Sequence, residues 1–532
     1  MALKLQAAAA ASVVLIAMSA SGAAFAQKAR GILRMYSPDS PASMSIHEEV
    51  TYATVVPMMG VFNNLVLFDQ HVKQNSLQSI VPDLATSWSW NEDGTQLTFR
   101  LREGVKWHDG KPFTARDVKC TWDLLQGKAS EKLRTNPRKS WYQNVEQVAT
   151  EGDLTAIFQL KRPQPALPAL LAPGYSPVYP CHVGPREMRQ HPIGTGPFKL
   201  AEFKLDEYIK VVRNPDYWKQ GRPYLDGVEY TIVPNRSTAI LSFIAGKFDM
   251  TFPYQVTVPL LRDVESQTPQ AICELRATNT AGTLIINRTA PPFDNPDLRQ
   301  AMALALDRKS FVDILTEGQG KIGSAMLPAP EGVWGLPADM IETLPGYNPD
   351  GQRNHTEARK IMKNFGYGPD KRLQVKVSAR NVPVLRDPAV IIIGQLKEIY
   401  IDGELETIET AQWFTRLARK DFQIGFIFIP AGVDDPDQQL YENYACSSER
   451  NYSGYCSPEI EKRFDQQSME PDQEKRKRLV WEIDKTLQQD GARPIIWYDR
   501  LATCWQPQVK GLTTMVNSIY NGYRFEDVWL DK

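Results

Sequence analysis

The residues with the clearest potential for chemistry form an acidic cluster late in the chain. Asp434, Asp435 and Asp437 directly follow 422–429, an apolar stretch typical of a buried strand. Ligand-binding loops commonly emerge where the strands of an open α/β sheet end. Two carboxylates could also serve as the acid and base of a hydrolase, and Asp before Pro436 is ordinary in a turn that opens a helix. Asp434 and Asp435 are therefore candidate ligand contacts, with a turn and helix cap as the alternative.

Other motifs give no support to an enzyme or a metal protein. Gly318 to Gly323 spells GxGxxG, but a helical stretch precedes it and a Pro-rich loop follows, whereas a dinucleotide site needs a strand before the glycines and a helix after them. GxSxG and GxxxxGK[ST] are absent from the sequence. The six histidines show no metal-ligand spacing and no CxxC occurs. We expect no cofactor and no metal.

Composition narrows the class of partner. The 61 Lys and Arg residues nearly balance the 62 Asp and Glu residues, for a formal charge of -1. Nucleic-acid binding needs a basic face, so nucleic acid is excluded as the partner. A chain of 532 residues is too long for one small domain, so two or more lobes are expected. Aromatic residues make up 10%, which could line a groove or simply fill cores.

The N-terminus has the pattern of a cleavable signal peptide over residues 1–26. Lys4 precedes an apolar run at 7–20, and Ala24-Phe25-Ala26 gives a small-x-small cleavage pattern. An uncleaved anchor is disfavoured because the strongly apolar part, 13–18, is too short to span a bilayer. The first cysteine is Cys120, so a lipid-anchored N-terminal cysteine is excluded. These features predict a protein exported to the periplasm.

Six cysteines in an exported chain can form up to three disulfides. Cys446 and Cys456 bracket a loop rich in Ser, Asn and Gly that a cross-link would hold shut, so we expect this pair. The sequence alone leaves the pairing of the other four open.

Strand-like and helix-like stretches alternate along the chain, which predicts an α/β architecture. Residues 31–36 are expected to form a first strand, and 88–102 a hairpin with Asp-Gly at its turn. Thr114 is expected to cap a helix that runs to about residue 126, and Asn295 to cap another. Between 375 and 429 strand and helix alternate again, as in an independent lobe.

Four stretches resemble the hallmarks of family 5 extracellular solute-binding proteins, the peptide and nickel group of ABC importers. They are 82–123 (PDLATSWSWNEDGTQLTFRLREGVKWHDGKPFTARDVKCTWD), 194–218 (GTGPFKLAEFKLDEYIKVVRNPDYW), 246–249 (GKFD) and 295–310 (NPDLRQAMALALDRKS). They follow the order found in the family and span nearly the whole chain after the signal peptide.

The resemblance implies a two-lobed periplasmic binding protein fold, with an extra subdomain inserted in lobe I. Lobe I would comprise 27–64, 192–283 and 506–532, the insertion 65–191, and lobe II 284–505. On this division Cys120 and Cys181 share the insertion, and Cys273 and Cys504 both lie near the hinge strands, so the resemblance makes both pairings plausible without deciding them.

The resemblance also implies a monomeric, non-enzymatic protein that binds a peptide or small molecule and docks on ABC permease subunits in the inner membrane. Peptide-binding members carry an aspartate in lobe II that neutralises the peptide α-amino group. The aligned stretch here, IFIPAGVDDPD, places Gly432 at that position. Asp434 or Asp435 could substitute, and an opine, an oligosaccharide or an aromatic acid stays open as the ligand. The remaining pocket candidates are Asn287, Trp413, Gly432, Tyr441 and Tyr498.

Overall fold

The computed structural model describes residues 31–531. The predicted signal peptide, residues 1–26, lies outside the described residues. Within 31–531, no helix is both long enough and apolar enough to cross a membrane.

Lobe I is the part of the molecule built on a four-stranded sheet in the order β1-β10-β9-β8. The first strand was predicted at 31–36, and Leu33 and Met35 alternate as buried positions with exposed Ile32 and Arg34. β1 pairs with β10 in parallel, whereas β10, β9 and β8 pair antiparallel. The elements are β1 (Ile32–Ser37), α2 (Tyr52–Met59), β8 (Phe198–Lys204), β9 (Tyr208–Arg213), β10 (Gly227–Ile232), α6 (Arg236–Ile244) and α7 (Val258–Gln267).

The inserted subdomain is an antiparallel sheet, β4-β5-β7-β6, that packs against α3. The predicted hairpin is confirmed as β4 and β5, with Gly94 at a φ of +69° in the turn. The predicted cap is also confirmed, because the Asp117 carboxylate accepts a hydrogen bond from the Thr114 amide at 2.9 Å. The elements are β2 (Val66–Phe68), β3 (Ile80–Pro82), β4 (Ala85–Trp90), β5 (Gln96–Leu101), α3 (Ala115–Leu125), β6 (Val145–Glu151), β7 (Thr155–Leu160), α4 (Leu167–Leu171) and α5 (Pro185–Gln190).

Lobe II is built on a five-stranded mixed sheet in the order β13-β12-β14-β11-β15. Asn295 caps α8 as predicted, accepting a hydrogen bond from the Asp297 amide at 2.9 Å. The glycines of the GxGxxG stretch follow the end of α9, where Glu317 and Gly318 have φ values of +50° and +80°, so they form a turn as expected. The strands are β11 (Ile272–Ile286), β12 (Leu373–Arg380), β13 (Ile401–Ile408), β14 (Ile424–Pro430) and β15 (Ile495–Trp505). The helices are α8 (Pro296–Ala305), α9 (Arg308–Thr316), α10 (Ala338–Ile341), α11 (Gly351–Asn364), α12 (Pro383–Lys397), α13 (Thr410–Ala418), α14 (Pro436–Tyr444), α15 (Pro458–Met469) and α16 (Gln473–Gln489).

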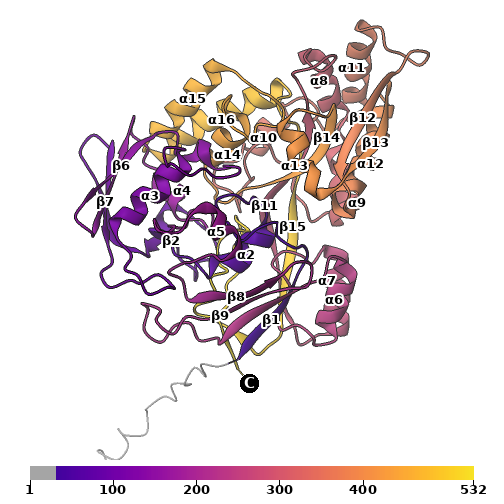
Figure 1. Ribbon diagram of the computed structural model, residues 1–532. Coiled ribbons are helices and arrows are strands. Elements are labelled where there is room, and N and C mark those ends of the chain that lie inside the picture. The colour runs from indigo at the N-terminus through magenta and orange to yellow at the C-terminus, as the bar shows by residue number, and fades with distance from the viewer. Residues whose placement is uncertain (1–30, 532) are drawn as a thin grey trace, which may run out of the picture.

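The long strands β11 and β15 run from one lobe to the other (Figure 1). At the lobe I end Ala502 bridges to Val256, and at the lobe II end Thr283 pairs with Ile495. Their register shifts between Ala277 and Ala281 and again between Gly282 and Thr283, so the strand pairing is irregular at the crossing between the lobes. A short pair, β16 (Val509–Lys510) and β17 (Trp529–Leu530), lies near the C-terminus.

The apolar cores follow the same division. One continuous core joins lobe I to the inserted subdomain and includes Met35, Trp122 and Val211. A separate core lies in lobe II around Phe426 and Trp497, and another joins α14, α15 and α16 of that lobe. Because each body has its own core, the lobes can move relative to each other about the crossing strands without unpacking either one.

Three disulfides cross-link the chain. Cys446 is bonded to Cys456, as predicted from the loop between them. Cys120–Cys181 and Cys273–Cys504 form the pairs that the family resemblance implied.

Candidate ligand-binding cleft

Two adjoining cavities lie between lobes I and II. The inner cavity has a volume of about 160 Å³ and the outer cavity about 570 Å³. Both are walled by lobe I on one side and by lobe II and the crossing strand β15 on the other. The residues that border both are Thr51, Tyr52, Arg236, Gln255, Arg380, Val384, Phe428, Asp499 and Leu501.

The charged groups of the cleft come from the ends of regular elements. Arg236 is the first residue of α6 in lobe I, and Arg380 is the last residue of β12 in lobe II. Arg236 donates a hydrogen bond to Gln255 Oε1 at 3.4 Å, and Gln255 Nε2 donates one to the Tyr52 hydroxyl at 2.7 Å. The start of α6 and the end of β12 thus bring guanidinium groups of opposite lobes to the same cavities.

Asp499 lies on β15 at the register slip and borders both cavities. Burial raises the pKa of its carboxyl to about 6, and the positive charge of Arg236 opposes that rise. Its Oδ1 accepts a hydrogen bond from the Arg500 amide at 3.0 Å. At neutral pH this carboxylate is the acidic counterpart of the cleft arginines.

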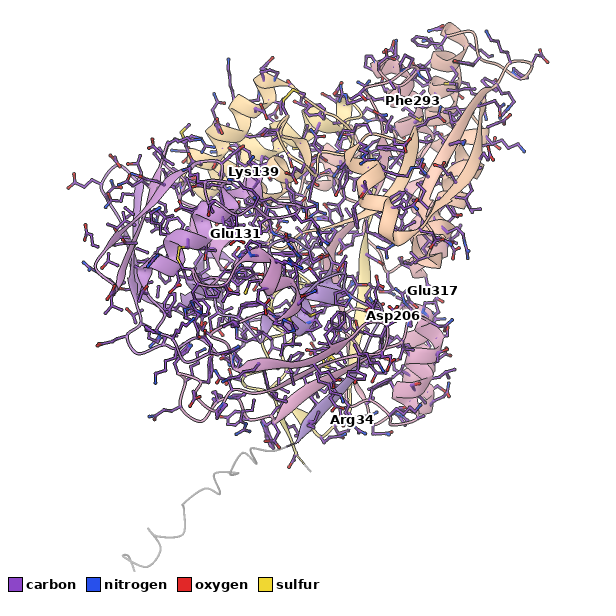
Figure 2. All side chains as sticks on the ribbon, viewed as in Figure 1. Arg34, Glu131, Lys139, Asp206, Phe293 and Glu317 are labelled. Atoms are coloured by element: carbon purple, nitrogen blue, oxygen red, sulfur yellow. A yellow bond between two sulfur atoms is a disulfide. The ribbon has the colours of Figure 1, made fainter. Side chains whose placement is uncertain are left out.

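One edge of the cleft is closed by an ion pair between the lobes. Arg262 on α7 contacts Glu317, the residue that follows α9 and is labelled in Figure 2. Leu315 and Thr316 at the end of α9 border the outer cavity, so this pair lies beside its opening.

Of the residues predicted from sequence, Trp413 borders the inner cavity. It lies on α13 with only 1% of its surface exposed and packs in a small apolar cluster with Ile285 and Leu417. Its neighbour Phe414 borders the cavity as well. Aromatic side chains therefore form part of the wall of the inner cavity.

Asn287, Tyr441 and Tyr498 are placed away from both cavities, and their polar atoms bind protein groups. Asn287 Nδ2 donates to the carbonyls of Lys420 and Phe422 at 2.9 and 3.0 Å. The Tyr498 hydroxyl donates to the carbonyl of Ser324 at 2.9 Å. The Tyr441 hydroxyl donates to Asp465 Oδ1 at 2.6 Å and accepts a hydrogen bond from Arg162.

Gly432 follows β14, and its carbonyl accepts hydrogen bonds from Ser518 Oγ at 2.9 Å and Asn521 Nδ2 at 3.2 Å. A Cβ at this position would meet the ring of Tyr175 at 3.2 Å and that of Trp141 at 3.4 Å. The main-chain group expected to face a ligand is thus engaged by the C-terminal segment, and aromatic rings fill the space beside it.

The carboxylates of the acidic cluster bind groups within lobe II and do not line the cleft. Asp435 caps α14 by accepting a hydrogen bond from the Asp437 amide at 2.9 Å, which is the turn and cap alternative raised from the sequence. Arg476 on α16 binds both oxygens of Asp435, at 2.9 and 2.8 Å, and Asp437 Oδ1 at 3.1 Å. Asp435 is 3% exposed, so this ion pair is buried.

Asp434 borders a third cavity, of about 110 Å³, where lobe II meets the inserted subdomain. Its Oδ2 accepts a hydrogen bond from the Val333 amide at 2.9 Å. Burial, followed by the nearby charge of Asp435, raises the pKa of Asp434 to about 7. Asp434 and Asp435 therefore lie apart from the cleft lined by Arg236 and Arg380.

Sequence reasoning missed Arg236, Arg380, Asp499 and Tyr52. A signal for Arg380 was present, because strand ends mark ligand loops in α/β sheets, and this residue lies in the stretch 375–429, where strands and helices were predicted to alternate. In the sequence analysis, the rule that ligand loops follow strand ends was applied only to the residues after 422–429, the stretch that forms β14.

Comparison with known proteins identifies the family. The sequence model of "Bacterial extracellular solute-binding proteins, family 5 Middle" matches residues 79–451. The chain belongs to this family. Its members are solute-binding proteins of ABC transporters, and the chain is a binding protein, not an enzyme.

Relatives with curated names include a "Probable di/tripeptide-binding protein 5" of Pseudomonas aeruginosa strain UCBPP-PA14. It is 25% identical over 462 residues, which cover 80% of this chain and 82% of the relative.

Two solved structures show the fold of this family 5 chain. The Helicobacter pylori periplasmic binding protein DppA, in complex with peptide STSA, has a TM-score of 0.82 at 23% identity, covering 95% of this chain and 99% of the other. The binding protein AgaA in complex with agropinic acid, from A. tumefaciens R10, has a TM-score of 0.79 at 20% identity, covering 94% and 99%. The predicted two-lobed periplasmic binding protein fold is confirmed.

Proposed function

We propose that this chain is the periplasmic binding component of an ABC importer. It captures a peptide or an organic solute of similar size between lobes I and II and delivers it to permease subunits in the inner membrane. The observation that carries the proposal is a pair of cavities bordered by side chains of both lobes, beside the strands that connect them.

Capture follows from this arrangement. A solute that contacts Tyr52 and Arg236 on lobe I and Arg380 and Phe428 on lobe II adds favourable contacts only when the lobes approach. Binding therefore shifts the population toward a closed form, and the permease can distinguish loaded from empty protein by that form.

Two observations bear on the class of ligand. Names of relatives that mention dipeptides and tripeptides support a peptide. The glycine at position 432, where the peptide-binding members are expected to carry an acid, favours testing an opine, an oligosaccharide and an aromatic acid beside peptides.

Thermal-shift screening followed by titration calorimetry tests the proposal. We expect at least one compound among dipeptides, tripeptides, opines, oligosaccharides and aromatic acids to raise the melting temperature, because a ligand that binds only the folded state stabilises it. We also expect each stabilising compound to be recovered unchanged. If every class leaves the melting temperature unaltered, or if the pure protein converts the compound, the proposal fails.

Export to the periplasm is the second part of the proposal, and it depends on cleavage after Ala26. N-terminal sequencing of the protein from a periplasmic fraction should read from Gln27. Protein that starts at Met1 and sediments with membranes would contradict it.

A further inference from the structure

The inner end of the cleft is the part of the inner cavity that Arg450 and Tyr520 border, and neither residue borders the outer cavity. Arg450 is 8% exposed and lies in the loop that the Cys446–Cys456 disulfide closes. Burial raises the pKa of the Tyr520 hydroxyl, and the nearby charge of Arg450 opposes that rise. A ligand group at the inner end would therefore lie against a buried cation.

The guanidinium of Arg450 has donors that the protein leaves free. Its Nη1 donates to Glu442 Oε1, which is the only hydrogen bond that this guanidinium makes among residues 31–531. Its Nε is buried without a partner, and its Nη2 bonds to no described residue. A buried N–H without a partner is costly, so an acceptor oxygen that enters the inner end would be stabilised there.

Positive charge exceeds negative charge around Glu442. Burial lowers the pKa of Arg138 and Arg493, and the Glu442 carboxylate opposes that fall in both, as it does for Arg450. Arg138 donates to main-chain carbonyls, and Arg493 donates to Asn443 Oδ1 at 2.8 Å, so both guanidinium groups bind neutral oxygens. One carboxylate is thus shared by three buried cations, and an added anion would lower the electrostatic energy of this region.

The charge at the inner end is opposite to the charge that a peptide N-terminus requires. The family resemblance places the aspartate that neutralises a peptide α-amino group at position 432, which is glycine here. A Cβ on Gly432 would meet the rings of Tyr175 and Trp141. Trp141 Nε1 donates to Glu442 Oε2 at 2.6 Å, and Arg450 is among the charges that oppose the rise caused by burial in the pKa of Tyr175. The side chains beside Gly432 thus lead to Arg450 and to a carboxylate that is already paired.

Asp499 does not supply the missing acid at the inner end. It is the acidic residue that borders the inner cavity among the described residues, and it borders the outer cavity as well. The charge that acts on its carboxyl is that of Arg236, at the start of α6 in lobe I. Arg450 therefore keeps its charge excess whether or not Asp499 is ionised.

We propose that the transported solute carries an acidic group in place of a free α-amino group at the end that enters the inner cavity, and that Arg450 binds this group. The inference rests on the proposed role in solute capture and specifies the class of ligand. Oxygens of an acidic group accept hydrogen bonds from the free guanidinium donors and compensate the shared charge of Glu442. A free amino group at the same place would bring two cations together. Opines with more than one carboxylate belong to the favoured class, and unmodified dipeptides do not.

Matched derivatives of one dipeptide test the inference. Dialanine has a free amino group, N-acetyl-dialanine is neutral at that end, and N-succinyl-dialanine has a carboxylate there. Opines and dicarboxylic acids, each with a monoamide, extend the series, and all affinities are measured by calorimetry. We expect N-succinyl-dialanine to bind at least tenfold more tightly than N-acetyl-dialanine, and dialanine to bind no more tightly than the acetylated form. We expect each acid that binds to lose at least tenfold in affinity as its monoamide.

Variants assign the effect to Arg450. Replacing Arg450 alone would leave Glu442 buried without its cation, so the test uses the double variant Arg450→Met, Glu442→Gln, which removes both charges. It should lose at least tenfold in affinity for the best acidic probe and change affinity for the matched neutral probe less than threefold, whereas structural damage would weaken both. Arg353→Gln removes one positive charge from an exposed position on α11 and is the control, with affinity within twofold of wild type.

Glu442→Gln tests the same site in the opposite direction. This variant keeps the Arg450 cation and removes the carboxylate that competes with the ligand for it. Affinity for the best acidic probe should rise at least threefold, and the protein without ligand should melt at a lower temperature because the buried cation has lost its partner. A fall in affinity for the acidic probe would contradict binding at Arg450.

The outcomes separate the two proposals. If dialanine or the neutral probes bind as tightly as the acidic ones, or if the double variant binds the best acidic probe like wild type, the inference is overturned and solute capture stands. If no compound of this series or of the wider thermal-shift screen binds, solute capture is contradicted and the inference fails with it.

Discussion

Single buried charges give the sharpest expectations at the residue scale, and Asp434 is one of them. The pKa of its carboxyl is about 7, raised by burial, so the ionised form is disfavoured in the folded state. A folded-state pKa above the unfolded value means that stability falls as pH rises from about 4, where the unfolded chain loses the proton, to about 7, where the folded protein loses it, and changes little above that.

We therefore predict that Asp434→Asn raises the free energy of unfolding at pH 8 by roughly 1–3 kcal/mol and at pH 5.5 by about half as much. Urea denaturation of both proteins at the two pH values measures this difference. Ligand affinity should be unchanged, because Asp434 borders the third cavity and not the cleft. A variant that is less stable at pH 8 would show that the carboxylate is held ionised.

Arg476 presents the opposite case, a buried cation that compensates two carboxylates. Replacing it by methionine leaves Asp435 and Asp437 buried without their partner. We predict a loss of about 3–5 kcal/mol in unfolding free energy, measured by urea denaturation at pH 7. Arg478→Met, at an exposed position on the same helix, is the control and should cost less than about 0.5 kcal/mol. Equal losses in the two variants would contradict a role for the buried pair.

At the scale of elements, the crossing strands are fixed to each other by a covalent bond. Cys273 on β11 lies directly opposite Cys504 on β15, and the bond joins residues 231 apart in the sequence. Cys446 and Cys456 are only 10 apart. A cross-link that closes a longer loop removes more conformational entropy from the unfolded chain.

The double variant Cys273→Ser, Cys504→Ser should thus lose more stability than Cys446→Ser, Cys456→Ser, by about 5 against about 3 kcal/mol in the loop-entropy estimate. Calorimetric melting of both variants and of wild type provides the comparison. A larger loss in the short-loop variant would show that contacts around Cys446, and not chain entropy, decide the effect.

Elements were predictable where their signals are local. Asp-Gly at 93–94 specifies its own hairpin turn, and Thr114 with Asp117 specifies the start of α3, so both were found from sequence. The cleft is different, because Arg236 and Arg380 are distant in the sequence and meet only after two lobes with separate cores have formed. Trp413 was chosen because aromatic residues suit cavity walls, and it borders the inner cavity. Tyr441, which was chosen for the same reason, instead bonds to Asp465 within the protein.

For the whole molecule, function depends on whether the lobes move as rigid bodies. The separate cores and the irregular pairing between Ala277 and Ala281 place the flexible point on the crossing strands. The ion pair between Arg262 and Glu317 joins the lobes beside the outer cavity, and opening of the lobes would lengthen or break it. Both side chains are partly exposed, and an exposed pair contributes little energy. The buried hydrogen bonds from Ser518 and Asn521 to the Gly432 carbonyl also link the lobes.

A solute contacts Arg236 on lobe I and Arg380 on lobe II together only when the lobes approach. We therefore predict that the radius of gyration in small-angle X-ray scattering falls when a compound that stabilises the protein in the thermal-shift screen is added at saturation. Arg380→Gln should contract less than wild type at the same compound concentration, whereas Arg353→Gln, which changes an exposed position on α11, should contract like wild type. Contraction of the Arg380→Gln protein without bound compound would instead assign closure to the hinge itself, with the solute following the movement and not causing it.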